Sequence, residues 1–230
     1  MKNPESEVGS VALFSNSDSS MIIDAEEIRP RDIYRHLINI ITPRPIAWVS
    51  TQSSSGIPNL APYSFFSGVG SRPPSLLFCP ANKRDGSPKD TLRNIEATGE
   101  FVVNTVSFEL AQQMHESSAD IDFETSEFDI VGLTAVPSSR IKAPRVKEAR
   151  ASIECELMQS LHLGTGPGAS NVVIGRIVAI QIDDDVLDAE GWADAEKLDT
   201  IGRMGNAGYV RTNDAFDLGA REVNENRKGA

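Results

Sequence analysis

Residues 42–51 read TPRPIAWVST, residues 59–66 read NLAPYSFF, and residues 89–95 read KDTLRNI. The first two stretches have the composition and length of strands, and Ser53-Ser54-Ser55-Gly56 between them is typical of a hairpin turn. In the third stretch, Asp90 has the character of an N-cap and Gly99 that of a stop signal. Together they predict a β-hairpin followed by the start of a short helix.

Working outward, apolar runs and alternating patterns predict further strands at 74–79, 101–106, 152–160 and 172–182. Helical spacing predicts helices at 31–41, 91–98, 108–117 and 192–198, with one helical turn within 123–133. Strands and helices do not alternate regularly, so a doubly wound sheet is excluded. The pattern favours a mainly β protein, a closed or nearly closed antiparallel β-barrel with appended helices.

The length of 230 residues suits one domain, expected at 21–220, with a flexible tail at 1–20 and a loose tail at 221–230. The first twenty residues carry four charged side chains and no apolar core segment, and no run approaches the ~20 apolar residues of a membrane helix. We therefore expect a cytoplasmic protein that does not enter a membrane.

The net charge of -11 argues against nucleic acid as the main partner. Residues 29–93 nevertheless carry nine Lys or Arg and three acids, a net +6, which leaves -17 elsewhere. Such a segment can focus a small anion, or its cations can lie scattered over the surface. Cys79 and Cys155 lie in apolar runs as expected free thiols, and with three histidines no metal-ligand spacing exists.

Two places could hold an anion beside a flat ring. Lys89 and Thr91 at a helix N-terminus suit a phosphate, although a plain helix start with an exposed lysine has the same sequence. Arg44, held extended between two prolines, suits bidentate phosphate binding. Trp48 falls on the same side of the strand, beside a ring or in the core, and Ser64 offers a hydroxyl.

Other motifs fail on their context. Gly164–Gly168 has the glycines of a dinucleotide fingerprint, but Pro167 and the following strand exclude the helix that this motif requires. Asp183–Asp188 lacks the glycine of a calcium loop. His115 and His162 have no visible partner and are interpreted as structural.

Taken in order, these stretches with RPPSLLFC, GEFVVNTV, EFDIVGLTAVPSSRI, IGRIV and IGRMGNAGYVRT resemble the flavin reductase-like, FMN-binding split-barrel family over roughly residues 25–220. The similarity is greatest to the branch that includes flavoredoxins. The resemblance implies a six-stranded antiparallel split barrel and a homodimer with FMN near its interface.

The resemblance also implies which residues contact the cofactor. Arg44, Ser50, Lys89 and Thr91 match the phosphate contacts, and Trp48, Ser64, Phe65 and Phe66 match positions near the ring and ribityl chain. The expected set is completed by Ile46, Ala61 and Tyr63 on the same strands, and by Arg203 and Tyr209 in a late Arg-Met-Gly-Asn-Ala-Gly-Tyr motif.

One departure bears on function. Reductases of the family carry Gly-Asp-His before a strand, where this chain has Gly168-Ala169-Ser170, so the histidine associated with the nicotinamide donor is missing. The first hypothesis is an FMN-dependent oxidoreductase of the NAD(P)H:flavin reductase type. The second is a non-catalytic FMN electron carrier that docks on a redox protein, for which an acidic surface is suited. A third is a split barrel that binds another cofactor, such as haem or pyridoxal phosphate.

Overall fold

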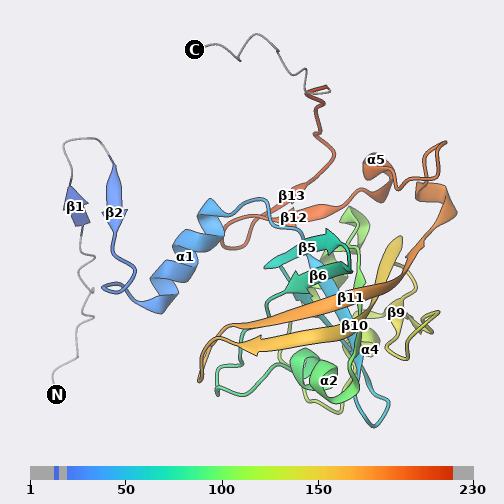
Figure 1. Cartoon of the computed structure of the whole chain (residues 1–230), viewed down its shortest axis with the longest axis horizontal. Coiled ribbons are helices and arrows are strands. Elements are labelled where there is room, and N and C mark those ends of the chain that lie inside the picture. Colours follow the sequence, from blue (N-terminus) through green and yellow to red (C-terminus); the bar gives the residue numbers. More distant parts are fainter. Residues whose placement is uncertain (1–12, 16–19, 220–230) are drawn as a thin grey trace.

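A seven-stranded antiparallel sheet dominates the computed structural model, which describes residues 13–15 and 20–219 (Figure 1). The strand order is β4-β3-β7-β10-β11-β6-β5. The bounds are β3 Ala47–Gln52, β4 Pro58–Tyr63, β5 Phe66–Ser71, β6 Pro74–Phe78, β7 Glu100–Asn104, β10 Ala151–His162 and β11 Asn171–Ile182. The predicted mainly β class is confirmed.

The sheet curls into a barrel that stays open at one seam. Side chains of β3 and β6, which lie four positions apart in the sheet, belong to one buried cluster with β7, β10 and β11. The edge strands β4 and β5 follow each other in the chain and are not paired with each other. The expectation of six strands is wrong by one. Phe66–Ser71 forms a strand of its own, and its glycines and exposed residues give no apolar alternation.

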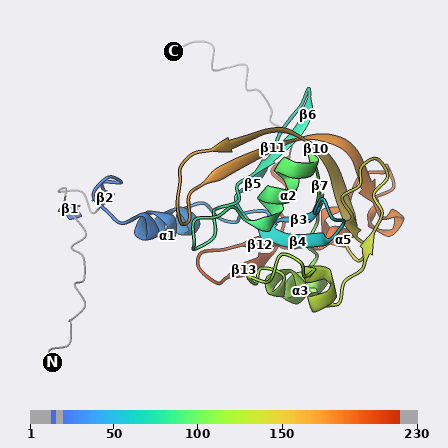
Figure 2. The ribbon, with the colours of Figure 1, turned by 90° about the horizontal axis from the view of Figure 1, so that it is seen from below.

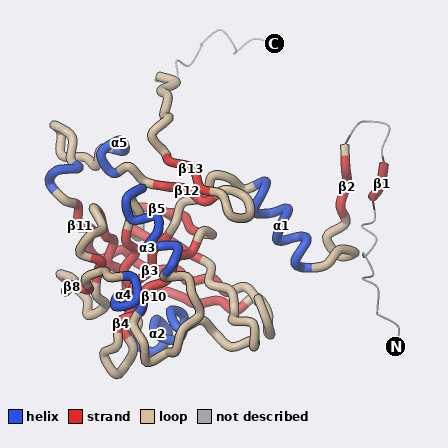
Figure 3. The backbone as a smooth tube through the Cα atoms, turned by 180° about the vertical axis from the view of Figure 1, so that it is seen from behind, coloured by secondary structure: helices blue, strands red, loops and turns tan. Residues whose placement is uncertain are grey.

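Two cores lie on opposite faces of β3. Ala47 and Val49 point into the barrel, where Leu92 and Ile95 of α2 (Asp90–Thr98) join them. Trp48 points outward into a second cluster that includes residues of α3 (Ala111–Glu116) and α4 (Glu127–Val131). Figure 3 shows α3 and α4 on the side of β3 and β4, in agreement with their contacts. The alternation of one strand therefore supports both cores.

The helix α1 (Pro30–Ile40) projects from the barrel together with the hairpin of β1 (Leu13–Ser15) and β2 (Met21–Ile23) (Figures 1 and 2). β1 falls within residues 1–20, the stretch expected to be a flexible tail. Residues 1–12 and 16–19 of that stretch lie outside the described part of the chain, and so does the expected tail at 221–230. The predicted helix at 91–98 is confirmed as α2, which ends at Gly99 with φ of 75°.

The remaining elements are short. They are the 3-10 turns Phe108–Leu110 and Asp184–Val186, α5 Ala195–Leu198, and the strands β8 Ala135–Val136, β9 Arg145–Val146, β12 Ile201–Arg203 and β13 Tyr209–Arg211. β12 and β13 form a hairpin beside the barrel, joined to it by backbone hydrogen bonds between Arg44 and Arg203. Within residues 20–219, no helix has the length and apolar character needed to cross a membrane.

Candidate functional site

Two adjoining cavities lie along β4 and form one groove. Lobe 1, of about 210 Å³, is walled by α1, β4, α3 and the β12–β13 hairpin; its lining residues are Tyr34, Arg44, Ile46, Pro62, Tyr63, Ser64, Met114, His115, Ser118, Arg203, Gly205, Asn206 and Tyr209. Lobe 2, of about 60 Å³, is walled by β4, α2, the loop after α3 and α4; its lining residues are Asn59, Ala61, Pro62, Tyr63, Lys89, Asp90, Thr91, Ser117, Ser118, Ala119, Asp120 and Glu127. Three residues are common to both lobes, so the cavities touch.

Arg44 forms the floor of lobe 1. It is only 3% exposed, and its guanidinium donates to the carbonyls of Ile38 (2.7 Å) and Ile41 (2.9 Å) and to the Ser64 hydroxyl (3.2 Å). Burial lowers the pKa of Arg44, and the nearby charge of Arg203 lowers it further, yet an arginine remains protonated. Its hydrogen-bond acceptors are all neutral, so lobe 1 retains a positive charge.

The β12–β13 hairpin and α3 form the rim of lobe 1. The Arg203 guanidinium lies 4.4 Å from the centre of the Tyr209 ring and donates to the carbonyl of Asn206 (2.6 Å). The Tyr209 hydroxyl lies 3.5 Å from Nδ1 of His115, at the limit of a hydrogen bond. These residues come from segments almost ninety positions apart, which only the fold brings together.

Lobe 2 is built on the N-terminus of α2. Lys89 is the N-cap residue of α2, and its side chain makes no capping hydrogen bond. No capping side chain therefore occupies the first N–H groups of the helix. The Lys89 ammonium lies 3.8 Å from Asp120, while Asp90 pairs with Lys83 at 2.8 Å and Arg93 at 3.3 Å. The helix terminus and one loosely paired lysine therefore face the cavity.

Asn59 organises the wall beside that terminus. Its Oδ1 accepts from the hydroxyl of Thr91 (2.8 Å) and of Thr51 (3.2 Å), and its Nδ2 donates to both carboxylate oxygens of Glu127 (2.9 and 3.0 Å). The hydroxyl proton of Thr91 is thus directed at Asn59. Toward an anion in lobe 2, Thr91 can offer its backbone N–H but not that proton.

Glu127 is a buried carboxyl group, 5% exposed, that also accepts from the N–H of Leu60 at 2.9 Å. Burial raises its pKa above the ordinary 4.5, and the charge of Asp90 acts in the same direction, against the three donors. The protonated form is therefore favoured more in the folded state than in the unfolded chain.

This shift makes a prediction about stability and pH. Above pH 4.5 the unfolded chain loses the Glu127 proton before the folded protein does, so the free energy of unfolding should fall as pH rises through that window. Glu127→Gln cannot titrate and should lack this component. Urea unfolding at a series of pH values measures this effect. The free energy of unfolding of wild type minus that of Glu127→Gln should fall as pH rises, and a rise would mean that the donors to the carboxylate dominate.

Tyr63 contributes a polar atom without a partner. Its hydroxyl is buried and has no hydrogen-bond partner in the structure. Burial raises the pKa of Tyr63; the adjacent Thr91 hydroxyl acts in the opposite direction but does not meet hydrogen-bond geometry. The Tyr63 ring packs inside the barrel, with its centre 5.1 Å from that of Phe78, so this hydroxyl is an unpaired polar atom of the interior and does not face either lobe.

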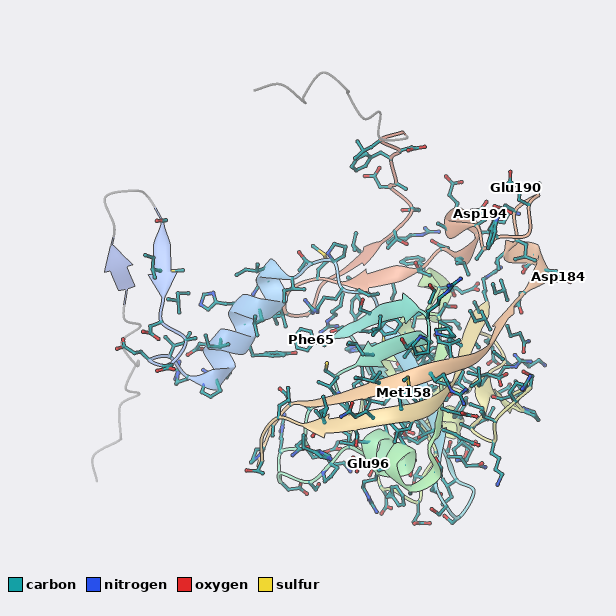
Figure 4. All side chains as sticks on the ribbon, in the orientation of Figure 1. Phe65, Glu96, Met158, Asp184, Glu190 and Asp194 are labelled. Atoms are coloured by element: carbon teal, nitrogen blue, oxygen red, sulfur yellow. The ribbon has the colours of Figure 1, made fainter. Side chains whose placement is uncertain are left out.

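Nine of the thirteen residues expected at the site line the two lobes: Arg44, Ile46, Ala61, Tyr63, Ser64, Lys89, Thr91, Arg203 and Tyr209. The other four do not. Trp48 is fully buried with its indole N–H on Ser117 (2.9 Å), and the Ser50 hydroxyl donates to the carbonyl of Pro144 (2.5 Å). Phe65 packs edge-on against Tyr34 of α1 and below Arg44, and Figure 4 shows it between α1 and the sheet. Phe66 lines a third, apolar cavity, which shares Arg44 and Ile46 with lobe 1.

Several lining residues were not expected from the sequence. The sequence interpretation treats His115 as structural, and its expected site does not include Tyr34, Asn59, Ser118, Asn206 or Glu127. Asn59 opens the stretch NLAPYSFF, so its polar side chain at the start of an apolar strand was a usable signal. The others become neighbours only through the folding of α1, α3, α4 and the β12–β13 hairpin around β4.

Comparisons with known proteins agree with one another. The flavin reductase like domain model matches residues 40–200. A protein of Aquifex aeolicus is 39% identical over 179 residues, 78% of this chain and 89% of that protein. Nitrilotriacetate monooxygenase component B from Bacillus cereus has 32% identity and a TM-score of 0.82 over 88% of this chain and 100% of its own. The 2-nitrobenzoate 2-nitroreductase from Pseudomonas fluorescens has 30% identity and a TM-score of 0.79 over 88% and 97%.

Proposed function

The chain belongs to the flavin reductase like domain family, and on that premise we propose that it is an FMN-dependent oxidoreductase, most simply an NAD(P)H:flavin reductase. The family match confirms the resemblance inferred from the sequence. The two structural relatives named above are, by their names, a monooxygenase component and a nitroreductase, which supports redox chemistry for this fold. A homodimer, which the resemblance implies, is part of the proposal.

The observation that carries the proposal is the two-lobed groove. Lobe 2 offers the free N–H groups of α2 and the Lys89 ammonium, which is the donor set that a phosphate prefers. Lobe 1 adjoins it with apolar walls at Ile46 and Pro62, the hydroxyl of Ser64 and the guanidinium of Arg44. Those groups suit a planar ring with a polar edge. We therefore place the FMN phosphate in lobe 2 and the ring in lobe 1.

The chain's own residues would act by holding and orienting. FMN, when bound, supplies hydride and electron transfer. Lys89 and the Thr91 N–H would fix the phosphate, while Glu127 and Asn59 hold the α2 terminus against β4. Arg44 would place positive charge under the ring, where it favours electron uptake.

One feature favours the second candidate, an FMN electron carrier. The loop at Gly168-Ala169-Ser170 lacks the histidine that the resemblance associates with the nicotinamide donor. The two functions differ in how the bound flavin is reduced. In the purified protein under anaerobic conditions, flavin absorption that bleaches rapidly with NADH or NADPH identifies a reductase. Bleaching by dithionite alone identifies a carrier, and a protein that takes up no FMN refutes both.

Lys89→Ala should weaken FMN binding by about 1–3 kcal/mol, because it removes the charge of a charge-assisted contact. Riboflavin, which has no phosphate, should bind the variant and the wild type equally. Lys142→Ala is the matched control, since Lys142 lines a different cavity. Fluorescence titration of both flavins measures these constants, and equal FMN affinity in Lys89→Ala and wild type would remove the phosphate from lobe 2.

A further inference from the structure

The rim of lobe 1 gathers donors on its exposed side. We call His115, Arg203 and Tyr209 the cationic rim. The Arg203 guanidinium is stacked on the Tyr209 ring at 4.4 Å, and the Tyr209 hydroxyl meets His115 at 3.5 Å. The stack fixes the plane of the guanidinium, so that little conformational entropy is lost when it binds a ligand. Arg203 and Tyr209 share one short hairpin, and His115 lies in the last turn of α3.

The charge of lobe 1 is not balanced by the protein. No aspartate or glutamate is among the lining residues of lobe 1, and within residues 20–219 neither Arg44 nor Arg203 has an ion-pair partner. Other arginines of this chain are paired: Arg150 with Glu109 and Asp185, and Arg211 with Asp199. Arg44 and Arg203 are paired in an antiparallel β-bridge and their guanidiniums repel each other. In a chain of net charge -11, two such neighbouring cations in one cavity form a place where an anion is favourable.

The two arginines differ in what they have left to offer. Arg44 is buried and directs its guanidinium at three protein acceptors. Arg203 is partly exposed and has one side-chain hydrogen bond in the described structure, to the carbonyl of Asn206. Since a guanidinium carries five N–H donors, Arg203 can still bind a carboxylate or phosphate bidentately. The floor of the lobe thus serves the fold and the cofactor, and the rim faces molecules that arrive from solvent.

We propose that the cationic rim recognises the anionic group, a carboxylate or a phosphate, of a small planar co-substrate that meets the flavin in lobe 1. Arg203 binds that group bidentately, and the Tyr209 hydroxyl and His115 supply further donors. The inference rests on the proposed function, because it takes the flavin ring as the floor of the co-substrate site. It assigns His115 and Arg203 to selection of the co-substrate rather than to holding FMN.

The test uses FMN-loaded protein and two matched pairs of probes. Benzoate and benzamide differ by the carboxylate, and nicotinamide mononucleotide and nicotinamide riboside differ by the phosphate. Binding is measured by the perturbation of flavin absorbance at low ionic strength. The charged member of at least one pair should bind about tenfold tighter than its neutral partner, the scale of a partly exposed charge-assisted contact. The pair that shows the preference identifies the anion, and added salt should reduce it.

Variants assign the preference to the rim. In Arg203→Gln, the charged and neutral probes should bind with affinities within about twofold of each other. Arg203→Lys should keep part of the preference for the charged probe, because lysine retains the charge but lacks the planar guanidinium. Arg211→Gln is the control: it removes the same charge from the same hairpin, but Arg211 pairs with Asp199 and lies outside lobe 1. His115→Gln provides a second removal of a rim donor, should Arg203→Gln not hold FMN.

Each outcome decides the inference. Equal binding of charged and neutral probes to FMN-loaded wild type overturns it and leaves the proposed function intact, because the flavin is then demonstrably bound. A preference that survives in both Arg203→Gln and His115→Gln overturns the assignment to the rim. Wild-type protein that takes up no FMN overturns the proposed function and the inference together.

Discussion

Replacing Trp48 by alanine is expected to lower the free energy of unfolding by about 3–5 kcal/mol, the scale for deleting a buried aromatic side chain. Trp48 is fully buried in the outer cluster with Ile46, Leu60 and Met114, and its indole N–H donates to Ser117. The variant would lose this packing and leave a cavity between β3 and α3. Urea unfolding followed by circular dichroism measures the change.

Trp48→Phe separates stability from cofactor binding. Phenylalanine keeps much of the apolar volume but lacks the donor, so the loss should be smaller, at roughly 1–3 kcal/mol. Because Trp48 lines neither lobe, the FMN dissociation constant and flavin absorption of Trp48→Phe should equal those of wild type. An altered flavin spectrum in this variant would instead support the ring contact that the family resemblance implies.

The position of Trp48 illustrates how far a local pattern reaches. Alternation correctly predicts that Ile46 and Trp48 share a face, and they do belong to one cluster. The same alternation says nothing about what covers that face. Lobe 1 reaches Ile46, whereas α3, whose chain segment lies more than sixty residues away, covers Trp48 through Ser117. A contact of that sequence separation leaves no trace in the strand itself.

Local chemistry accounts for what was predicted well. The Ser53–Gly56 turn, the stop of α2 at Gly99 and the long strands β10 and β11 all follow from short-range rules, and the structure contains each of them. β5 was missed because its residues Phe66–Ser71 are mostly exposed and include two glycines, so neither alternation nor propensity marks them. Pairing with β6 supplies the strand conformation there.

The candidate site divides in the same way. Lys89, Thr91, Arg44 and Ser64 lie within the stretch from 42 to 95, where prolines and a helix start give local reasons for a phosphate site. The rim of lobe 1 has no local signature: His115 sits in an ordinary short helix. Its role depends on a hairpin almost ninety residues later. The sequence therefore shows no partner for His115, whereas the fold brings the Tyr209 hydroxyl within 3.5 Å of its Nδ1.

Arg44→Ala is expected to lower the free energy of unfolding by about 3 kcal/mol, because it removes three hydrogen bonds from a charged donor and leaves the buried carbonyl of Ile38 unpaired. The acceptors are the carbonyls of Ile38 and Ile41 at the C-terminal end of α1 and the hydroxyl of Ser64 on the segment after β4. Arg44 thus joins the projecting helix to the edge of the barrel. Without it, the amides of α1 should exchange with solvent faster than those of β10 and β11.

The controls for Arg44 follow from its geometry. Arg44→Lys keeps the charge but presents one ammonium instead of a planar fork, so it should retain part of the stability and part of the α1 protection. Arg35→Ala removes a charge from exposed α1 without touching the barrel and should change neither. FMN binding should weaken in Arg44→Ala because lobe 1 loses the cation of its floor. A different result would contradict this view of Arg44: unchanged amide exchange in α1 of Arg44→Ala, together with a lower free energy of unfolding. The hydrogen bonds of Arg44 would then stabilise only the edge of the barrel, and α1 would be held by the packing of Tyr34 against Phe65.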